Sequence, residues 1–345
     1  MIQQRDCVET FDPSGVGLDN GNFCGLPFNY DSANIILIGV PWEVTVSYHA
    51  GTAQGPAAVL AASPQLDLYD FDNPDGWRRG IYMLPIESWI LAQNEQLRQD
   101  AADIISATEQ GDSIASNTEL AAKLQHLNHA CEAVNQWLYQ QSMQALNHGK
   151  RVGIIGGDHS VPLGYLQALA TAEPNFGILH IDAHADLRHA YQGFKFSHAS
   201  IMHNVLRLPQ VGKLVQVGIR DICQDEVSLI DQSQGRIVAH YDQNLKRDRY
   251  SGVPWAQTCQ QILADLPQRV YVSFDVDGLD PKLCPHTGTP VPGGLELEEV
   301  FYLLRCVVDS GRHIIGFDVS EVGNHDWDGN VAARAVYKLC NLLVS

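Results

Sequence analysis

The chain has 345 residues, which suits one large α/β domain or two small ones. A hydrophobic content of 45% with 18% charged residues is ordinary for a globular protein. The formal net charge of −18 argues against a nucleic-acid partner. No apolar run approaches the ~20 residues that a membrane-spanning helix needs. Because the N-terminus also lacks the basic start and apolar stretch of a signal peptide, we expect a cytoplasmic protein.

Short apolar segments alternate with helical segments along the chain, and several are apolar throughout, as in strands covered on both faces. The expected strands are Asn34–Val40, Arg151–Ile155, Phe176–Ile181, Lys213–Gly218, Arg236–His240, Arg269–Phe274 and His313–Phe317. The expected helices include Pro56–Ala62, Val161–Thr171, Trp255–Asp265, Glu296–Asp309 and Gly329–Leu343. This alternation predicts an α/β fold, a single three-layer α/β/α domain with a mostly parallel sheet.

Two regions stand apart from this pattern. Residues 1–33, rich in glycine, are expected to form an irregular arm that packs on the domain at 34–345 or on a neighbour. Residues from about 87 to 149 read as a long helical insertion. Its second half, Asn117–His148, starts at a possible Asn117 cap and ends before Gly149. The eight cysteines form no CxxC pair, which indicates reduced thiols and argues against a cysteine zinc site.

Carboxylates and imidazoles are concentrated in three short segments, each directly after an expected strand. The segments are Gly156–Ser160 (GGDHS), His180–Asp186 (HIDAHAD) and Ser273–Pro281 (SFDVDGLDP). Extended backbone sends alternate side chains to one face, so Asp182, His184 and Asp186 can converge, as can Asp275 and Asp277. Open α/β sheets bind ligands at the carboxyl ends of their strands. We therefore expect these side chains to meet at one site.

With His159, the set contains four carboxylates and two imidazoles. Such groups would repel and desolvate one another without a counter-charge, which divalent cations supply. The oxygen-rich set without thiolate favours Mn²⁺ over zinc, with nickel, cobalt or iron as substitutes. More carboxylates than one ion needs indicate two bridged ions ~3.5–4 Å apart. For a single Asp-x-Asp sequence, a structural role of the acids in caps and turns would be the better interpretation. Three such clusters, each after an expected strand, favour metal binding instead.

These motifs, together with Gly316–Val322 (GFDVSEV), resemble the signature motifs of the arginase/agmatinase family, the ureohydrolases. The resemblance runs from about Ile35 to the C-terminus and includes Gly51–Pro56 (GTAQGP). It implies an arginase-like catalytic domain that cleaves the guanidinium C–N bond of a small guanidino compound to urea and an amine. A small cationic substrate would be attracted by the acidic surface, although solubility alone also accounts for the charge. The family further implies a homotrimer or homohexamer.

The resemblance also implies how two manganese ions share the six ligands. One ion would be held by His159, Asp182, Asp186 and Asp275. The other would be held by His184, Asp182, Asp275 and Asp277, so that Asp182 and Asp275 bridge the ions. Two metals can lower the pKa of a shared water enough to give hydroxide near neutral pH, and this hydroxide would attack the guanidinium carbon.

The family pattern also implies roles in catalysis or substrate binding for four residues. Asp277 would accept the hydroxide proton, and His198 would protonate the leaving amine, a task that suits imidazole at neutral pH. Glu321 would bind the guanidinium through two parallel N–H bonds. Thr289 would line the same site, although a turn residue is nearly as good an interpretation.

The chain departs from the family after Asp186, and this leaves the substrate open. Arg188 replaces the asparagine of arginases, which argues against an arginase. The Asp-Leu-Arg sequence is similar to formimidoylglutamases, which release formamide, and Arg188 could pair with a substrate carboxylate or with an internal acid. His198 instead favours the agmatinase-like and guanidino-acid hydrolases. The loop Glu43–His49 is a further candidate for specificity, and the proline expected after Glu321 is replaced by residues 324–327 (NHDW).

Two interpretations outside the ureohydrolases are weaker. Deacetylases with a related fold use a single zinc site with fewer acids, and the six ligands here argue against them. A pseudoenzyme that binds metal or partners without turnover is the non-enzyme alternative. The presence of all six ligands, His198 and Glu321 argues against it.

Overall fold

The structure, a computed structural model, describes residues 8–343, so Cys7 and the first residues of the expected arm lie outside the described part. In that part the centre is a parallel sheet in the order β2-β1-β3-β8-β7-β4-β5-β6. The strands are β1 Ile35–Val40, β2 Ile81–Met83, β3 Arg151–Gly156, β4 Phe176–Ile181, β5 Val211–Ile219, β6 Ile237–Tyr241, β7 Arg269–Asp275 and β8 His313–Ser320. Every expected strand is present, and the predicted parallel sheet is confirmed.

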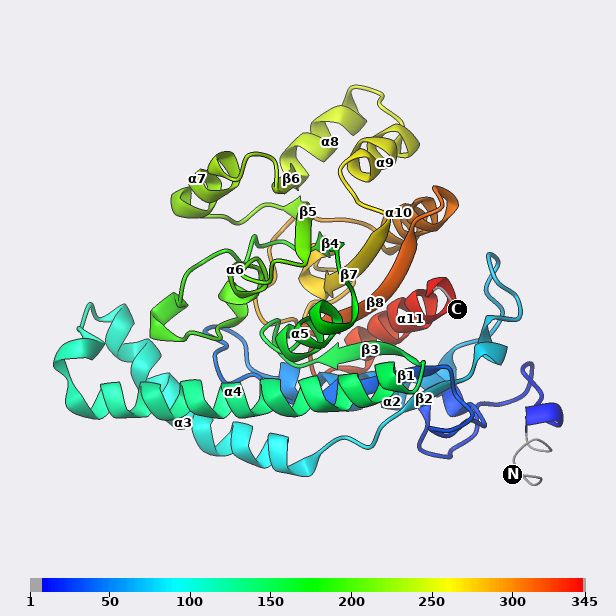
Figure 1. Ribbon diagram of the computed structural model, residues 1–345, viewed down its shortest axis with the longest axis horizontal. Helices are drawn as coiled ribbons and strands as arrows, with labels where there is room; N and C mark the ends of the chain where they lie inside the picture. The colour runs from blue at the N-terminus through cyan, green and yellow to red at the C-terminus, as the bar shows by residue number, and fades with distance from the viewer. Residues whose placement is uncertain (1–7, 344–345) are drawn as a thin grey trace.

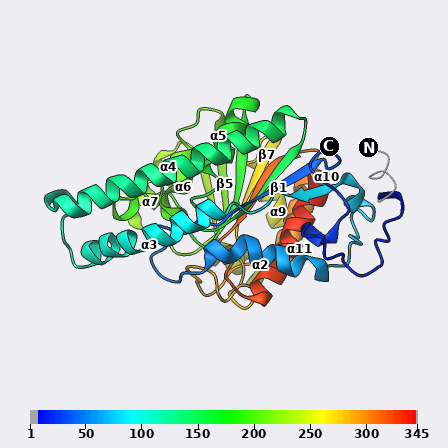
Figure 2. The same ribbon diagram turned by 90° about the horizontal axis from the view of Figure 1, so that it is seen from below.

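Helices cover both faces of the sheet, with α4 and α5 on one side and α2 and α11 on the other (Figure 2). The helices are α2 Gly55–Ala62, α3 Ser88–Glu109, α4 Thr118–Asn147, α5 Leu163–Ala172, α6 Ile201–Val205, α7 Gln224–Gln232, α8 Asp242–Tyr250, α9 Trp255–Ala264, α10 Leu297–Asp309 and α11 Asp326–Leu342. The strands β1 and β4 are buried along their whole length, which explains why β1 is apolar throughout and β4 is apolar apart from His180. The helices α6, α7 and α8 were not among the expected elements.

A pair of long helices, α3 and α4, projects beyond the end of the sheet (Figure 1). The predicted cap of α4 is confirmed, because the Asn117 side chain accepts hydrogen bonds from the backbone N–H groups of Glu119 and Leu120. The helix stops before Gly149, whose φ of 72° lies in the left-handed region. The helix α4 thus begins and ends where local sequence signals place its ends.

The edge strand β2 is short and was missed in the sequence. The Asn22 side chain donates to the carbonyl of Ile81 at 3.0 Å and accepts from the N–H of Met83 at 3.0 Å. This amide therefore occupies the place of a further strand and covers part of the sheet edge. Phe23 and Leu26 beside it are fully buried. The described part of the arm thus packs on its own domain.

The strand order decides where the polar segments meet. Strands β3, β8, β7 and β4 are neighbours, although they lie far apart in sequence. Because all of them are parallel, the segments that follow them leave the sheet at the same edge. Among the described residues, no helix is both long and apolar enough to cross a membrane, and all the described cysteines are free.

Candidate metal centre and active site

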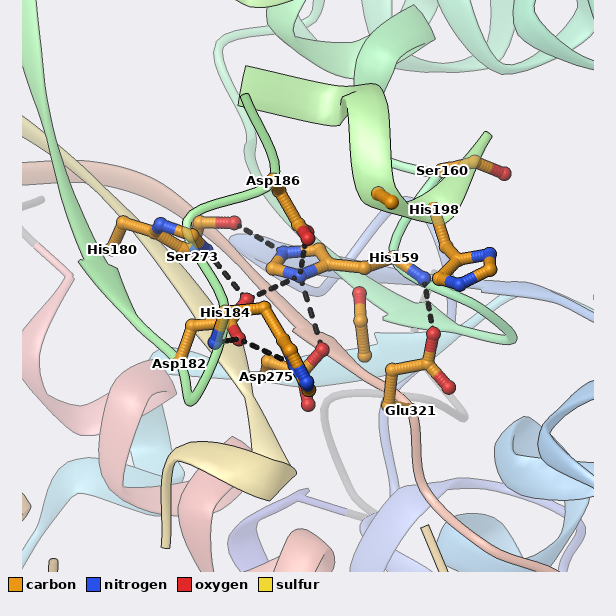
Figure 3. A network of polar contacts seen from close by, with 12 residues as sticks. His159, Ser160, His180, Asp182, His184, Asp186, His198, Ser273, Asp275 and Glu321 are labelled. Atoms are coloured by element: carbon orange, nitrogen blue, oxygen red, sulfur yellow. Dashed lines mark hydrogen bonds and ion pairs between the residues drawn. The ribbon is translucent and has the colours of Figure 1, made fainter. Parts of the chain in front are cut away.

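His159, on the loop after β3, lies among three carboxylates from two other strand ends (Figure 3). Its Nδ1 atom is 3.0 Å from Oδ2 of Asp182, 3.3 Å from Oδ2 of Asp186 and 3.1 Å from Oδ2 of Asp275. Atoms bound to one transition ion at ~2.0–2.2 Å lie about 3 Å from one another, so this spacing suits a shared cation. These four residues are the first ligand set expected from the sequence.

His184 forms a second group beside the first. Its Nδ1 atom lies 3.0 Å from Oδ2 of Asp277 and 3.5 Å from Oδ1 of Asp182. The two oxygens of Asp182 therefore face different histidines, His159 and His184, as a bridging ligand requires. The structure brings all six sequence-predicted ligands together, and it leaves their division between two ions as a proposal.

Close backbone contact holds the second and third ligand segments together. The backbone N–H of Ala183 donates to Oδ1 of Asp277 at 3.0 Å. A Cβ atom on Gly278 would lie 2.7 Å from the backbone nitrogen of Asp182, so only glycine allows this approach. Asp186 has a φ of 54°, a strained conformation for a residue with a side chain. The local geometry is thus constrained where the carboxylates converge.

His180 also belongs to this cluster, although the sequence analysis did not include it among the ligands. Its Nε2 atom lies 2.7 Å from Oδ2 of Asp182, and its Nδ1 atom lies 2.9 Å from Nε2 of Gln216. His180, Asp182, His184 and Asp186 continue one alternation along the chain, which was the available signal. His180 is placed to orient Asp182 from behind.

The electrostatics of the cluster fit divalent cations. Burial, and then the charge of Asp182, raises the pKa of Asp186 to about 6. Burial, and then the charge of Asp277, raises the pKa of Asp275 well above its usual range. Burial would also raise the pKa of Asp182, but the surrounding imidazoles outweigh it and hold this pKa well below its usual range. Clustered buried acids of this kind are stabilised by cations, and the oxygen and imidazole donors suit hard or borderline metal ions.

His198 is buried beside the cluster and lines the same cavity. Its backbone N–H donates to Oγ1 of Thr45 at 3.1 Å, and the same oxygen lies 3.2 Å from Nδ1 of His198. Thr45 in turn donates to Oδ2 of Asp158 at 3.1 Å. Burial, with His184 and then His159 adding, lowers the pKa of His198 to about 3. The ring is therefore neutral in the metal-free protein. Its orientation is set by Thr45, which the sequence analysis covered only as part of the loop Glu43–His49.

Glu321, directly after β8, is buried and has a φ of 63°. Its Oε1 atom accepts the backbone N–H of His159 at 2.9 Å, whereas its Oε2 atom has no hydrogen-bond partner in the described chain. Burial, and then the charge of Asp158, raises the pKa of Glu321 well above its usual range. An unpartnered buried acceptor is costly, so this oxygen is prepared for a donor that the chain does not contain.

Four of the six candidate ligands line a cavity of about 160 Å³, namely His159, His184, Asp186 and Asp275. Thr289 lines it, and its Oγ1 atom donates to Oδ2 of Asp277 at 3.4 Å. Arg188 lines it as well, and among the described residues no other arginine or lysine does. The Arg188 guanidinium lies over the ring of Tyr191, and its Nε atom is 3.8 Å from Oε2 of the buried Glu226. An internal acid for Arg188 is therefore present, and the guanidinium still borders the cavity.

The loop Glu43–His49 borders the cavity through Ser47. The Nη1 atom of Arg98, on α3, donates to the carbonyl oxygens of Val44 and Val46, each at 2.8 Å. The helical insertion therefore supports the wall of the site, a contact that no local sequence signal reveals. Tyr48 is 70% exposed and stacks on His49 with ring centroids 3.9 Å apart. An aromatic surface thus lies at the end of this loop.

The fold and the cluster define an α/β protein with a candidate metal centre at the carboxyl ends of its parallel strands. The chain belongs to the arginase family, whose profile matches residues 33–344. It is 31% identical over 315 residues to the N(1)-aminopropylagmatine ureohydrolase of Thermus thermophilus, covering 91% of each chain. It is 32% identical over 310 residues to an agmatinase of Salmonella dublin, covering 87% of this chain and 84% of that protein.

Solved structures support the fold. The proclavaminate amidino hydrolase from Streptomyces clavuligerus superposes with a TM-score of 0.70 at 24% identity, covering 95% of this chain and 98% of that chain. An agmatine ureohydrolase of Thermoplasma volcanium superposes with a TM-score of 0.70 at 21% identity, covering 94% of each chain. At these identities the likeness concerns the fold, and it confirms the arginase-like α/β architecture expected from the motifs.

Proposed function

We propose that this protein is a metal-dependent ureohydrolase that cleaves the guanidinium C–N bond of a small guanidino compound to urea and an amine. The observation that carries the proposal is the convergence of His159, His184 and four aspartates beside a cavity that Glu321 also lines. The ureohydrolase and agmatinase names of similar proteins support the same reaction class.

We assign the six ligands to two divalent cations, with Mn²⁺ as the first metal to test and nickel or cobalt as alternatives. His159, Asp182, Asp186 and Asp275 would hold one ion. His184, Asp182, Asp275 and Asp277 would hold the other. When bound, such ions supply positive charge and activate water for attack near neutral pH.

Glu321 would bind and orient the guanidinium group. Its unpartnered Oε2 atom can accept one N–H of the substrate, and Oε1 keeps a second lone pair beside its bond from His159. This contact would fix the guanidinium carbon above the carboxylates. A bound cation would also favour the ionised form of Glu321, whose pKa burial raises.

Proton transfer falls to two side chains. Asp277 lies next to His184, with its Oδ2 atom 3.0 Å from Nδ1 of that ring, and would take the proton from the attacking water. His198, held by Thr45, would deliver a proton to the leaving amine, because an unprotonated amide anion is a very poor leaving group. Thr289 would hold Asp277 in place through its hydrogen bond.

Formimidoylglutamate hydrolysis is the second candidate, and Arg188 is the observation that favours it. A guanidinium at the border of the cavity can pair with a carboxylate at the far end of a substrate. Arg188 could equally pair with the carboxylate of a guanidino acid. It therefore favours a substrate with a carboxylate, but it does not distinguish a guanidinium from a formimidoyl group. The product distinguishes the two candidate reactions, because formimidoylglutamate hydrolysis releases formamide and a ureohydrolase releases urea.

A product screen tests the proposal. Manganese- and nickel-loaded protein would be assayed for urea with arginine, agmatine, guanidinobutyrate, guanidinopropionate, arcaine and guanidine, and for formamide with formimidoylglutamate. Urea formation that is absent from an Asp277→Asn variant supports a ureohydrolase. Metal binding without either product would instead support a pseudoenzyme. The trimeric or hexameric assembly and the cytoplasmic location stay predictions.

A further inference from the structure

A second cluster of metal-binding side chains lies at the start of α11, outside the cavity described above. His286 lies in the loop before Thr289, and His325 and Asp328 lie at the start of α11. One ligand atom from each of the three residues lies within 4.8 Å of the others. The cluster shares no residue with the six ligands around His159, so the proposed reaction does not use it.

The distances within this cluster suit a transition-metal ion. Nδ1 of His286 lies 2.9 Å from Oδ1 of Asp328, similar to the spacing of His159 Nδ1 and its carboxylates. Two ligands at ~2.0–2.1 Å from one ion are about 3 Å apart. Asp328 is fully buried, whereas the His286 side chain is 49% exposed. One side of the site is therefore rigid, and the other is open to incoming metal and water.

The two imidazole rings lie face to face. The rings of His286 and His325 have centroids 4.0 Å apart and an interplanar angle of 16°. A neutral imidazole keeps a lone pair and is a common metal ligand. Because the lone pair of an imidazole nitrogen lies in the ring plane, one of the two stacked rings must turn before both can bind the same ion beside Asp328.

Hydrogen bonds also explain part of the arrangement without metal. Oδ2 of Asp328 accepts the backbone N–H of His286 at 2.9 Å, and Nδ1 of His325 accepts the backbone N–H of Trp327 at 3.2 Å. Both ends of the cluster are therefore held in place before any ion binds. The atoms left for a cation are the two ring nitrogens of His286, Nε2 of His325 and Oδ1 of Asp328, none of which takes part in these backbone contacts.

We propose that His286, His325 and Asp328 bind a late first-row transition ion such as Zn²⁺, separate from the binuclear centre. Two imidazoles and one carboxylate are borderline ligands that suit zinc, nickel or cobalt. Three protein ligands leave a coordination position for water. The ion would join the loop that carries Thr289 to the segment after Glu321, which already touch because the backbone of Gly323 packs against the carbonyl of His286.

Counting bound zinc tests the proposal. Protein without an affinity tag would be dialysed against micromolar free Zn²⁺, and the zinc per chain would be measured by elemental analysis. We expect the His325→Gln and His286→Gln variants each to bind one zinc fewer than the unmodified protein. The matched control is His126→Gln, which removes an exposed histidine of α4 that belongs to neither cluster. Equal zinc in all four proteins would overturn the proposal.

The zinc measurement can be interpreted whether or not the proposed ureohydrolase reaction is correct. In an Asp182→Ala background, which is expected to lose the binuclear centre, one histidine-dependent zinc should remain. If Asp182→Ala keeps its metal, the loss of zinc per chain caused by His325→Gln can still be measured against the unmodified protein. Circular dichroism of each variant confirms that it is folded. The substitution at His325 alters an exposed side chain, so folding is least at risk there. Loss of zinc on His126→Gln as well would indicate non-specific surface binding and refute the site.

Discussion

The Oε1 atom of Glu321 accepts a hydrogen bond from the backbone N–H of His159 across 2.9 Å. This contact connects the end of β8 to the loop after β3, two adjacent strands of the sheet. The proposed guanidinium-binding acid is therefore positioned directly against a proposed metal ligand. Because both residues follow buried parallel strands, their separation is set by the sheet and does not depend on a flexible loop.

Replacing Asp182 by alanine should remove metal and activity together. Its two oxygens face His159 and His184, so both groups of ligands lose a member. Loss of an outer-sphere partner already costs ~10–100-fold in metal affinity, and a direct ligand should cost more. Metal content after dialysis measures the effect, with Asp112→Ala, at an exposed aspartate after α3 that belongs to neither ligand group, as control. Unchanged metal in Asp182→Ala would show that the bridging assignment is wrong.

The His198→Ala variant should keep its metal and lose rate. His198 contacts Thr45 and not the six ligands' carboxylates, so metal content should equal that of the unmodified protein. General acid–base groups contribute ~10²–10⁴-fold, and we expect kcat to fall within this range. Added imidazole should restore part of the rate. A variant with normal kcat would exclude His198 from proton transfer.

A methyl group at Gly288 should act on substrate binding through Glu321. The Cβ of Gly288→Ala would lie 2.6 Å from Oε2 of Glu321, so the carboxylate must move. The φ of Gly288 lies outside the left-handed region, and alanine is tolerated by the backbone. Because a shift of about 1 Å can cost ~100-fold, we expect a raised KM and a kcat/KM lowered by up to that factor. Thermal unfolding checks that Tm is unchanged. An unaltered KM would argue against Glu321 as the guanidinium site.

Arg188→Gln separates the classes of substrate. If Arg188 pairs with a substrate carboxylate, kcat/KM for guanidino acids or formimidoylglutamate should fall ~10–100-fold, as for loss of a charged hydrogen bond. Guanidine, which has no carboxylate, should be unaffected. Equal losses on every substrate would mean instead that Arg188 acts structurally, through Glu226 and Tyr191.

The stabilisation by metal should increase with pH. Burial and then Asp182 raise the pKa of Asp186 to about 6, and burial and then Asp277 raise that of Asp275. The metal-free fold therefore gains stability from protonation below the unfolded value of ~3.9 and loses it as pH rises through about 6. Metal replaces these protons, so its affinity rises over the same window. The difference in Tm between metal-loaded and chelator-treated protein should widen as pH passes through this window. A constant difference would contradict this coupling.

Much of the fold and of the candidate site was predictable because the signals are local. The segment Phe176–Ile181, apolar apart from His180, indicates a strand buried on both faces, and the alternation that follows it places Asp182, His184 and Asp186 on one side. The ends of α4 are likewise marked by local signals, the capping side chain of Asn117 and the left-handed conformation of Gly149. Each of these inferences needs only a few consecutive residues and the period of the backbone.

Other features exist only through contacts between distant parts of the chain. Three-residue β2 is a strand because it pairs with β1, and Asn22 covers its free edge. Arg98 of the insertion reaches the loop after β1. Thr45 reaches His198 across more than a hundred residues. The sequence by itself determined which side chains carry the chemistry, since residue type and short-range period are local. Tertiary structure alone decided what supports and orients them, because packing between remote segments follows from the strand order and not from any local pattern.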